Sequence, residues 1–273
     1  MIEHLLPDID DIETRIVGHW VEQHAEGRLD TVELSAHTSE GYELRLQVRI
    51  PARIHDHALH VFIHGQAKRE KYTPPVFYRR GSSRRVGAVC VFLCDPILLY
   101  SQDCSIGWHL LGDEALWPFV RGLIQNLSAA HLSRGVVWHG SSAGAYAAIR
   151  NTLRWSGPAL AIAVAPQNDP TEFFYWPEFA SYASLPRTAV PEPLHVLLDR
   201  QGLHDDSMVH IMVNDKDTYH LLAHIRPLLP FADSYRQFAI RMIHNDMGHE
   251  RIGEADYWAN YALAERRWRE HQP

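Results

Sequence analysis

The spacing of hydrophobic and polar positions changes along the chain. Residues 30–37 and 41–50 alternate between apolar and polar side chains around the polar turn 38–41, which predicts a β-hairpin. Residues 86–93 form a continuous apolar run, which is typical of a parallel strand buried on both faces of a sheet. The pattern therefore predicts antiparallel strands at the start of a sheet and parallel strands after them.

The rest of the chain alternates between strand-like and helix-like segments. Further strands are expected at 59–65, 159–165, 209–214 and 237–244, and a strand, a turn and a helix within 135–154. Helices are expected at 8–27, 114–131, 173–183, 193–201, 220–229 and 255–270. This alternation predicts a mostly parallel sheet with helices on both faces. The 273 residues show no linker or repeat, so one α/β domain over 1–273 is expected, with long loops at 66–85 and 95–113 over the site.

The segment 136–149 carries the strongest chemical signal. A short apolar run leads into Gly140-Ser141-Ser142-Ala143-Gly144, and small helix-favouring residues follow. A strand, a sharp turn and a helix form the context in which Gly-x-Ser-x-Gly presents a nucleophilic serine. A Cβ at either glycine would collide with the neighbouring strand or helix. The phase of the motif selects Ser142 as the nucleophile, and a tight turn without chemistry is the alternative.

A serine nucleophile needs a base, and the base needs an orienting acid. In an open α/β sheet these groups follow the carboxyl ends of strands. Asp215 and Asp217 both follow a predicted strand, and we favour Asp217 because a short turn carries the acid back toward the histidine. For the base we favour His249 over His244, because Gly248 lets the backbone turn toward the serine. Asp215 and His244 stay open as alternatives.

An oxyanion that develops at such a serine needs two converging N–H donors. One is expected from the amide of Ala143, which opens a helix. The other is expected from the loop after His64-Gly65, most simply from the amide of Gln66, with His64 orienting the loop. A plain strand end is the alternative interpretation of His64-Gly65.

Charge and composition exclude several classes of protein. The net charge of −7 argues against a general nucleic-acid binder, and no apolar run approaches the length of a membrane span. Residues 1–8 lack the basic start and apolar core of a signal peptide. The cysteines, Cys90, Cys94 and Cys104, are odd in number, so we expect reduced thiols and a cytoplasmic location.

Two further clusters bear on the chemistry. Histidines gather at His55, His57, His60 and His64, where a solvated or hydrogen-bonded cluster is expected because the order is not a familiar metal-hydrolase spacing. Basic side chains gather in the loop 66–85, which follows the predicted oxyanion strand, and they are Lys68, Arg69, Lys71, Arg79, Arg80, Arg84 and Arg85. Guanidinium groups suit phosphates or carboxylates, as in coenzyme A or an acidic glycan, and a solvated loop is the alternative.

These features resemble the α/β-hydrolase superfamily over nearly the whole chain, including its Ser, Asp, His order. Shorter segments resemble bacterial surface-polysaccharide O-acetyltransferases of the capsule type. Those segments are Phe62-Ile63-His64-Gly65 with Pro75, Phe77 and Arg79; Asp95-Pro96 with Ile106-Gly107-Trp108; residues 140–144; and Asn214, Asp217, His220 and His224 with Pro230-Phe231.

The resemblance implies an α/β-hydrolase fold and a triad of Ser142, Asp217 and His249. In that family the triad carries an acetyl group from acetyl-CoA to a sugar hydroxyl, so acetyl-CoA is the expected acyl donor and a glycan the expected acceptor. No metal and no bound cofactor are expected, and the oligomeric state is left open. Substrate contacts are expected from His64, Arg79, Arg80 and Trp108.

Three functions compete at this point. The favoured one is a serine-dependent acyl-transfer enzyme, either an O-acetyltransferase or an esterase acting on a carbohydrate or related ester. The second is a binding or regulatory protein on a hydrolase scaffold that has no turnover. The third is a metal-dependent hydrolase that uses the cluster at 55–64.

Overall fold

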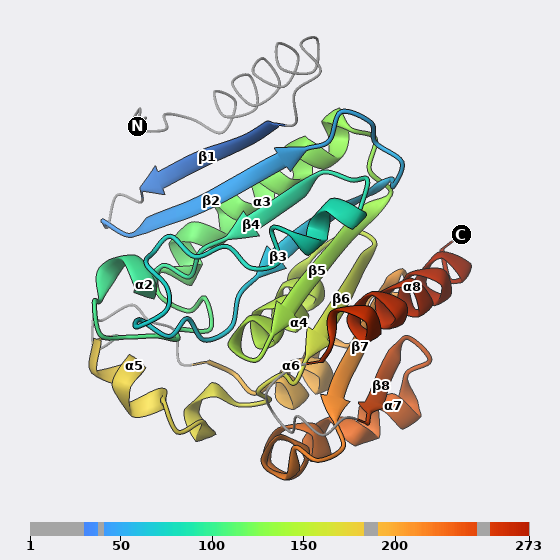
Figure 1. The fold of residues 1–273 in the computed structure, drawn as a ribbon. Helices are drawn as coiled ribbons and strands as arrows, with labels where there is room; N and C mark the ends of the chain where they lie inside the picture. The colour runs from blue at the N-terminus through green and yellow to red at the C-terminus, as the bar shows by residue number, and fades with distance from the viewer. Residues whose placement is uncertain (1–29, 38–40, 183–190, 245–251, 273) are drawn as a thin grey trace.

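A computed structural model describes residues 30–37, 41–182, 191–244 and 252–272. Eight strands form one sheet in the order β1-β2-β4-β3-β5-β6-β7-β8 (Figure 1). Strand β2 runs antiparallel to β1 and to β4, and the remaining neighbours are parallel. The predicted fold class is confirmed: a mostly parallel sheet that starts with an antiparallel hairpin.

The elements agree with most of the predicted segments. The strands are β1 (Asp30–His37), β2 (Glu43–Ile50), β3 (Ala58–Ile63), β4 (Cys90–Leu93), β5 (Gly135–Ser141), β6 (Ala159–Val164), β7 (Ser207–Asn214) and β8 (Phe238–Ile243). The α-helices are α2 (Ile97–Tyr100), α3 (Asp113–Ala130), α4 (Ala143–Arg154), α5 (Trp176–Tyr182), α6 (Leu194–Gln201), α7 (Leu229–Ser234) and α8 (Glu254–Glu270). Short 3-10 turns are η1 (Ser82–Arg85), η2 (Pro170–Glu172) and η4 (Arg226–Leu228), and η3 (His220–Ile225) is a π-helix.

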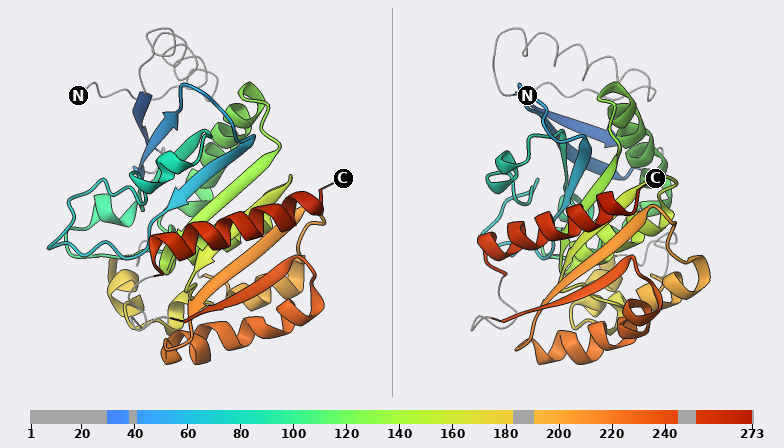
Figure 2. Two further views of the ribbon diagram at one scale, coloured as in Figure 1. Left: turned by 45° about the vertical axis from the view of Figure 1, so that its right-hand side comes forward. Right: turned by 90° about the vertical axis from the view of Figure 1, so that its right-hand side faces the viewer.

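Helices cover both faces of the sheet. Helix α8 crosses one face in front of β5, β6 and β7, while α3, α4 and α6 lie on the other (Figures 1 and 2). Side chains of β5 show why, because neighbouring residues of a strand point to opposite faces. The Trp138 ring packs against Trp117 of α3, with ring centroids 6.0 Å apart, and His139 faces Tyr257 of α8. The site at the carboxyl ends of the central strands therefore rests on a core packed from both sides.

Two predicted elements differ from the structure. Strand β4 is shorter than the apolar run 86–93, because the Gly87 carbonyl leaves the ladder and accepts from the amides of His55 and Asp56. The predicted helix 220–229 is divided into η3, η4 and α7, because prolines at 227 and 230 cannot donate within a continuous helix. The predicted helix at 8–27 lies outside the described residues.

The three cysteines are free and buried. Burial raises the pKa of Cys90 to about 11 and that of Cys94 to about 12, so both thiols stay protonated near neutral pH. In the described part of the chain, no helix combines the length and the apolar character that crossing a membrane requires.

Candidate active site

Ser142 lies in a strained turn between β5 and α4. Its backbone has φ 54° and ψ −120°, a conformation that costs free energy for any residue with a Cβ. A Cβ built on Gly140 would overlap the Gly144 carbonyl oxygen, and one on Gly144 would lie 2.5 Å from the carbonyl oxygens of Ile63 and His64. The predicted need for both glycines is confirmed. The turn raises Ser142 to a partly exposed position beside the end of β3.

The loop after β3 lies directly against this turn. A Cβ on Gly65 would overlap the Ser141 carbonyl oxygen and come within 3.2 Å of Ser142 Cβ. The Gln66 amide bonds to no other described residue, although the next amide along the chain bonds to the Ser105 carbonyl. Helix α4 begins at Ala143, whose N–H belongs to the first turn and lacks an intrahelical acceptor. Among the described residues, two backbone amides without a hydrogen-bond acceptor thus flank Ser142: that of Gln66, in the loop after β3, and that of Ala143, at the start of α4.

His64 supports the loop that carries Gly65. Its Nδ1 donates to the Gly65 carbonyl at 2.6 Å, and its Nε2 accepts from the Asp95 amide at 2.9 Å. This pattern requires the neutral ring, and burial lowers the pKa of His64 accordingly. The ring is buried and its two hydrogen bonds join the loop after β3 to Asp95. The substrate contact expected of His64 stays a prediction.

Asp95 holds the second long loop near the same turn. Its carboxylate accepts from the Ile97 amide at 3.2 Å and from the His109 amide at 3.0 Å. Trp108 and His109 both take a left-handed backbone, with φ 53° and 54°. Trp108 is completely buried, and the substrate contact expected of its ring stays a prediction.

Gln167 is a polar group next to Ser142 that the sequence analysis missed. Its Nε2 donates to Ser142 Oγ at 2.7 Å, and its Oε1 accepts from Trp108 Nε1 at 3.0 Å. The side chain is fully buried, and it follows shortly after the end of β6 at Val164. A polar residue just after a fully buried parallel strand was the available signal, because that is where site residues of an open α/β sheet lie.

The candidate acids occupy different environments. Asp217 is buried, and its carboxylate accepts from the backbone amide and the ring Nδ1 of His220, both at 3.2 Å. Asp215 is exposed and lies 2.6 Å from Nδ1 of His244, which is also exposed. Asp215 and His244, the alternative acid and the alternative base, therefore pair with each other at the surface. His249 lies outside the described residues, so its role stays a prediction.

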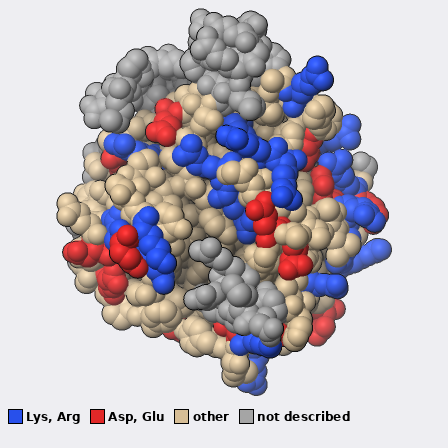
Figure 3. Space-filling view, in the orientation of Figure 1, with Lys and Arg blue, Asp and Glu red and all other residues tan. Residues whose placement is uncertain are grey.

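The basic loop divides into anchored and exposed side chains. Arg69 is anchored, because it donates to the carbonyls of Cys104, Leu98 and Ser101 and so ties the two long loops together. The Arg79 guanidinium stacks 3.4 Å from the ring centroid of Tyr257. The exposed members are Lys68, Lys71, Arg80, Arg84 and Arg85, of which Arg85 pairs with Glu254 at 3.2 Å. In Figure 3, Lys and Arg side chains gather beside a shallow hollow on the face that carries α8.

The histidine cluster is divided, because His64 supports the loop beside Ser142 whereas His60 lies away from the candidate active site. His60 lies under α8, where its Nδ1 is 2.9 Å from His139 Nε2 and its Nε2 is 3.2 Å from Asp56. Tyr257 OH lies 2.6 Å from His139 Nδ1 and completes a buried chain in which each group donates to the next. The hydrogen-bonded interpretation is confirmed for His60. No described group of three His, Cys, Asp or Glu residues is placed to hold a metal ion.

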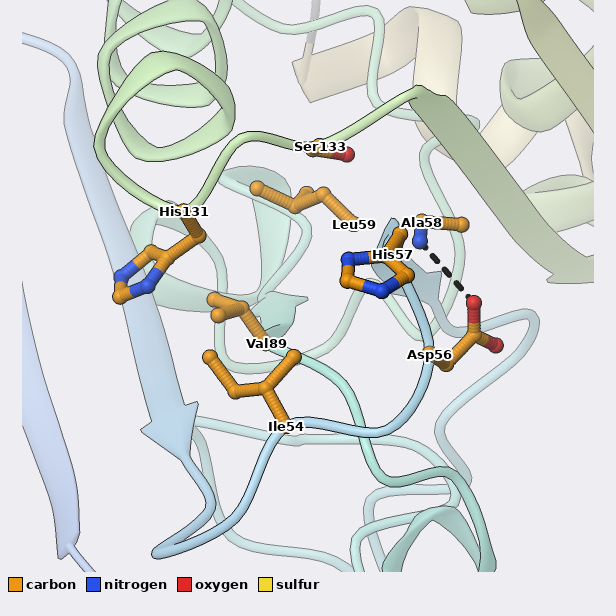
Figure 4. A pocket seen from close by; sticks show the side chains of 8 residues that line it. All are labelled: Ile54, Asp56, His57, Ala58, Leu59, Val89, His131 and Ser133. Atoms are coloured by element: carbon orange, nitrogen blue, oxygen red, sulfur yellow. Dashed lines mark hydrogen bonds between the residues drawn. The ribbon is translucent and has the colours of Figure 1, made fainter.

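A small hollow lies at the opposite end of the strands (Figure 4). It is lined by Ile54, Val89 and His131 among others, and Asp56 accepts there from the Ala58 amide at 3.0 Å. Strand β3 begins at Ala58, whereas the turn that carries Ser142 follows the carboxyl end of β5. The hollow is therefore separate from the candidate active site.

The sheet order and the turn after β5 define an α/β-hydrolase fold, and solved structures agree. A capsule O-acetyltransferase of Neisseria meningitidis serogroup A is 16% identical with a TM-score of 0.59, over 81% of this chain and 90% of that one. An esterase of Pyrococcus furiosus is 12% identical with a TM-score of 0.56, over 92% and 94% of the two chains. An S-formylglutathione hydrolase from Agrobacterium tumefaciens is 17% identical with a TM-score of 0.55, over 89% and 94%. No family model and no curated protein matches the chain.

Proposed function

We propose that this protein is a serine-dependent acyl-transfer enzyme. The observation that carries the proposal is the strained backbone of Ser142 at the start of α4, with Gly65 packed against it. Such strain is kept where a reactive group must be held in place. The similar solved structures include esterases and an acetyltransferase on the same fold.

In the proposed reaction, Ser142 Oγ attacks the carbonyl carbon of an ester or thioester. His249 takes the hydroxyl proton and passes it to the leaving group, and Asp217 orients the histidine. The amides of Ala143 and Gln66 hold the oxyanion, with Gly65 allowing the close approach. Water or a sugar hydroxyl then resolves the acyl-enzyme.

The acyl donor that we propose is acetyl-CoA, and the acceptor is a glycan hydroxyl. The solved capsule O-acetyltransferase includes a form in complex with CoA. The exposed cations Arg80, Arg84, Lys68 and Lys71 can bind phosphates of such a donor at the rim. We also propose that residues 1–273 form one domain bordered at the site by loops 66–85 and 95–113, and that it works in the reducing cytoplasm, where buried free thiols persist.

The first experiment measures turnover of p-nitrophenyl acetate and labelling by a fluorophosphonate, with Ser142→Ala beside the native protein. Loss of both signals in Ser142→Ala supports the proposed nucleophile, and labelling that survives the substitution contradicts it. Ser141→Ala is the matched control, because Ser141 precedes the turn and should keep both signals.

A second experiment separates transferase from esterase. Free thiol is followed after addition of acetyl-CoA, with and without an acidic polysaccharide. Thiol release that requires the polysaccharide supports transfer, whereas equal release without it supports hydrolysis. A protein that does neither, and does not label, is the binding protein of the second hypothesis, and activity lost on chelation would favour the metal-dependent one.

A further inference from the structure

Gln167 forms a bridge between the nucleophile and the second long loop. Its amide joins Ser142 Oγ at 2.7 Å to the Trp108 indole nitrogen at 3.0 Å. Both Gln167 and Trp108 have no solvent exposure. A fully buried amide with both ends bonded is held in one orientation, and here its NH2 end bonds to Ser142 Oγ.

The chemistry of the two partners fixes which end of the amide faces the serine. An indole N–H can only donate, so it must meet the Gln167 carbonyl oxygen, and the amide NH2 must face Ser142. The serine oxygen is then an acceptor in this bond. Its own proton cannot point at Gln167 and stays free for the base.

The indole itself is held by packing. Its ring meets Phe179 and Phe173 edge-on, with centroids 5.6 and 6.1 Å away, and Trp176 at 5.9 Å. Edge-on aromatic contacts of this kind favour one ring orientation. The direction of the Gln167 amide is therefore set by an aromatic cluster some distance from the serine.

We propose that Gln167 is a further catalytic residue, whose amide N–H stabilises Ser142 Oγ whenever that oxygen carries negative charge. This inference rests on the proposed function. In the first half-reaction Oγ bonds to the acyl carbon, the bond from that carbon to the donor sulfur or oxygen breaks, and the hydroxyl proton passes through the base to the leaving group. In the second half, the acceptor oxygen bonds to the acyl carbon, the electron pair of the breaking bond returns to Oγ, and the acceptor proton reaches Oγ through the base.

The test measures the second-order rate of fluorophosphonate labelling for three variants and a control. Gln167→Ala removes the donor and should lower the rate about 10- to 100-fold, as expected for a hydrogen bond to a developing charge. Trp108→Phe keeps an aromatic ring but frees the amide to rotate, and should lower the rate less. Trp155→Phe is the control, because Trp155 follows the carboxyl end of α4 and packs against Trp138 instead of Trp108, and it should leave the rate unchanged.

Gln167→Glu tests the direction of the bond. At pH 8 the carboxylate accepts a hydrogen bond from the serine hydroxyl and places a negative charge beside Oγ, so the labelling rate should fall more than about 100-fold. As the pH falls toward 5.5 the buried carboxyl takes up a proton and becomes a donor, so the ratio of variant to native rate should rise. The ratio cancels the titration of the base, which both proteins share, and a purely structural role would not move it.

The outcomes are distinct. A lower rate in Gln167→Ala together with a pH-dependent ratio in Gln167→Glu supports the inference, and thermal unfolding checks that each variant folds. Native-like rates in both variants, or a ratio that does not change with pH, overturn it. If Gln167→Ala does not fold, Gln167→Glu decides, since its shape is the same. If the native protein is labelled only at Ser142, the proposed function stands even when the Gln167 variants label at the native rate. If the native protein is not labelled, both the proposed function and this inference are contradicted.

Discussion

At the scale of single residues, the contact between Gly65 and the serine turn leaves no room for a side chain. A Cβ at Gly65 would overlap the Ser141 carbonyl oxygen, which is backbone and cannot move aside cheaply. Gly65→Ala should therefore push the Gln66 amide away from the site and lower kcat about 100-fold or more, as expected for the loss of an oxyanion donor. Gly81→Ala is the matched control, because nothing lies within 4 Å of its added Cβ. The measurement is kcat for hydrolysis of p-nitrophenyl acetate. Equal kcat values in the two variants would contradict the proposed role of the Gln66 amide.

The two candidate acids can be separated by isosteric substitutions. Asp217→Asn should lower kcat about 10⁴-fold, because the amide no longer fixes the tautomer of the base. Asp215→Asn should stay close to the native rate, because Asp215 is exposed and already pairs with His244. The reverse order of effects would transfer the acid role to Asp215 and suggest His244 as the base.

The residue scale also shows where sequence analysis reaches its limit. Ser142 could be predicted because the glycine requirement is local to five residues of the chain. The Gln167 bridge could not, because it joins residues 25 and 59 positions apart in sequence, and only the folded sheet brings them together. For the same reason, Trp108 was predicted as a site residue but its burial was not.

At the scale of elements, α4 is tied to the start of α3 by an ionic contact. Asp113 accepts from Arg150 at 2.8 Å and from Arg154 at 2.8 and 2.9 Å. Arg154 also stacks 3.5 Å from the ring centroid of Trp117. Burial alone would raise the pKa of Asp113, but the two guanidinium groups lower it below its ordinary value. The contact therefore stabilises helix α4, which begins directly after Ser142.

Asp113→Asn should destabilise the protein, because it leaves two mostly buried guanidinium groups without their counter-charge. The expected loss in free energy of unfolding is about 2 kcal/mol, measured by urea denaturation. Glu114→Gln is the matched control at an exposed neighbouring position, and it should change stability little. A loss no larger than that of the control would show that the ionic contact contributes nothing net.

Element prediction succeeded where one physical pattern governed the whole segment. The hairpin of β1 and β2 follows from alternation, and α8 follows from its apolar spacing, with bounds within a residue of the prediction. The segment after β7 failed because two prolines override the helical pattern and leave a π-helix, a 3-10 turn and a short helix. Periodicity predicted an element there but not its hydrogen bonding.

At the scale of the whole molecule, buried histidines link folding to pH. His64, His139 and His224 are all buried, and burial lowers the pKa of each, to about 4 for His224. The folded protein thus keeps these rings neutral, whereas the unfolded chain binds protons once the pH falls below about 6.5. The stability that the neutral rings contribute is complete above that pH and is lost as the pH falls toward 4. Each ring can contribute up to about 1.4 kcal/mol per pH unit in that window.

The midpoint of urea unfolding should therefore fall steadily between pH 7 and pH 5. Asp56, whose pKa is lowered to about 2, begins to lose its own contribution only below about pH 5. His224→Leu is the sharpest variant, because neither ring nitrogen of His224 has a hydrogen-bond partner among the described residues. The substitution removes one titrating group without breaking a hydrogen bond among the described residues. The free energy of unfolding should therefore change less steeply with pH, by the contribution of one proton. A midpoint that stays level from pH 7 to pH 5 would mean that the folded protein takes up protons as readily as the unfolded chain. Because a domain of this kind is stable by only about 5–15 kcal/mol, three such rings are enough to set the acid limit of the fold.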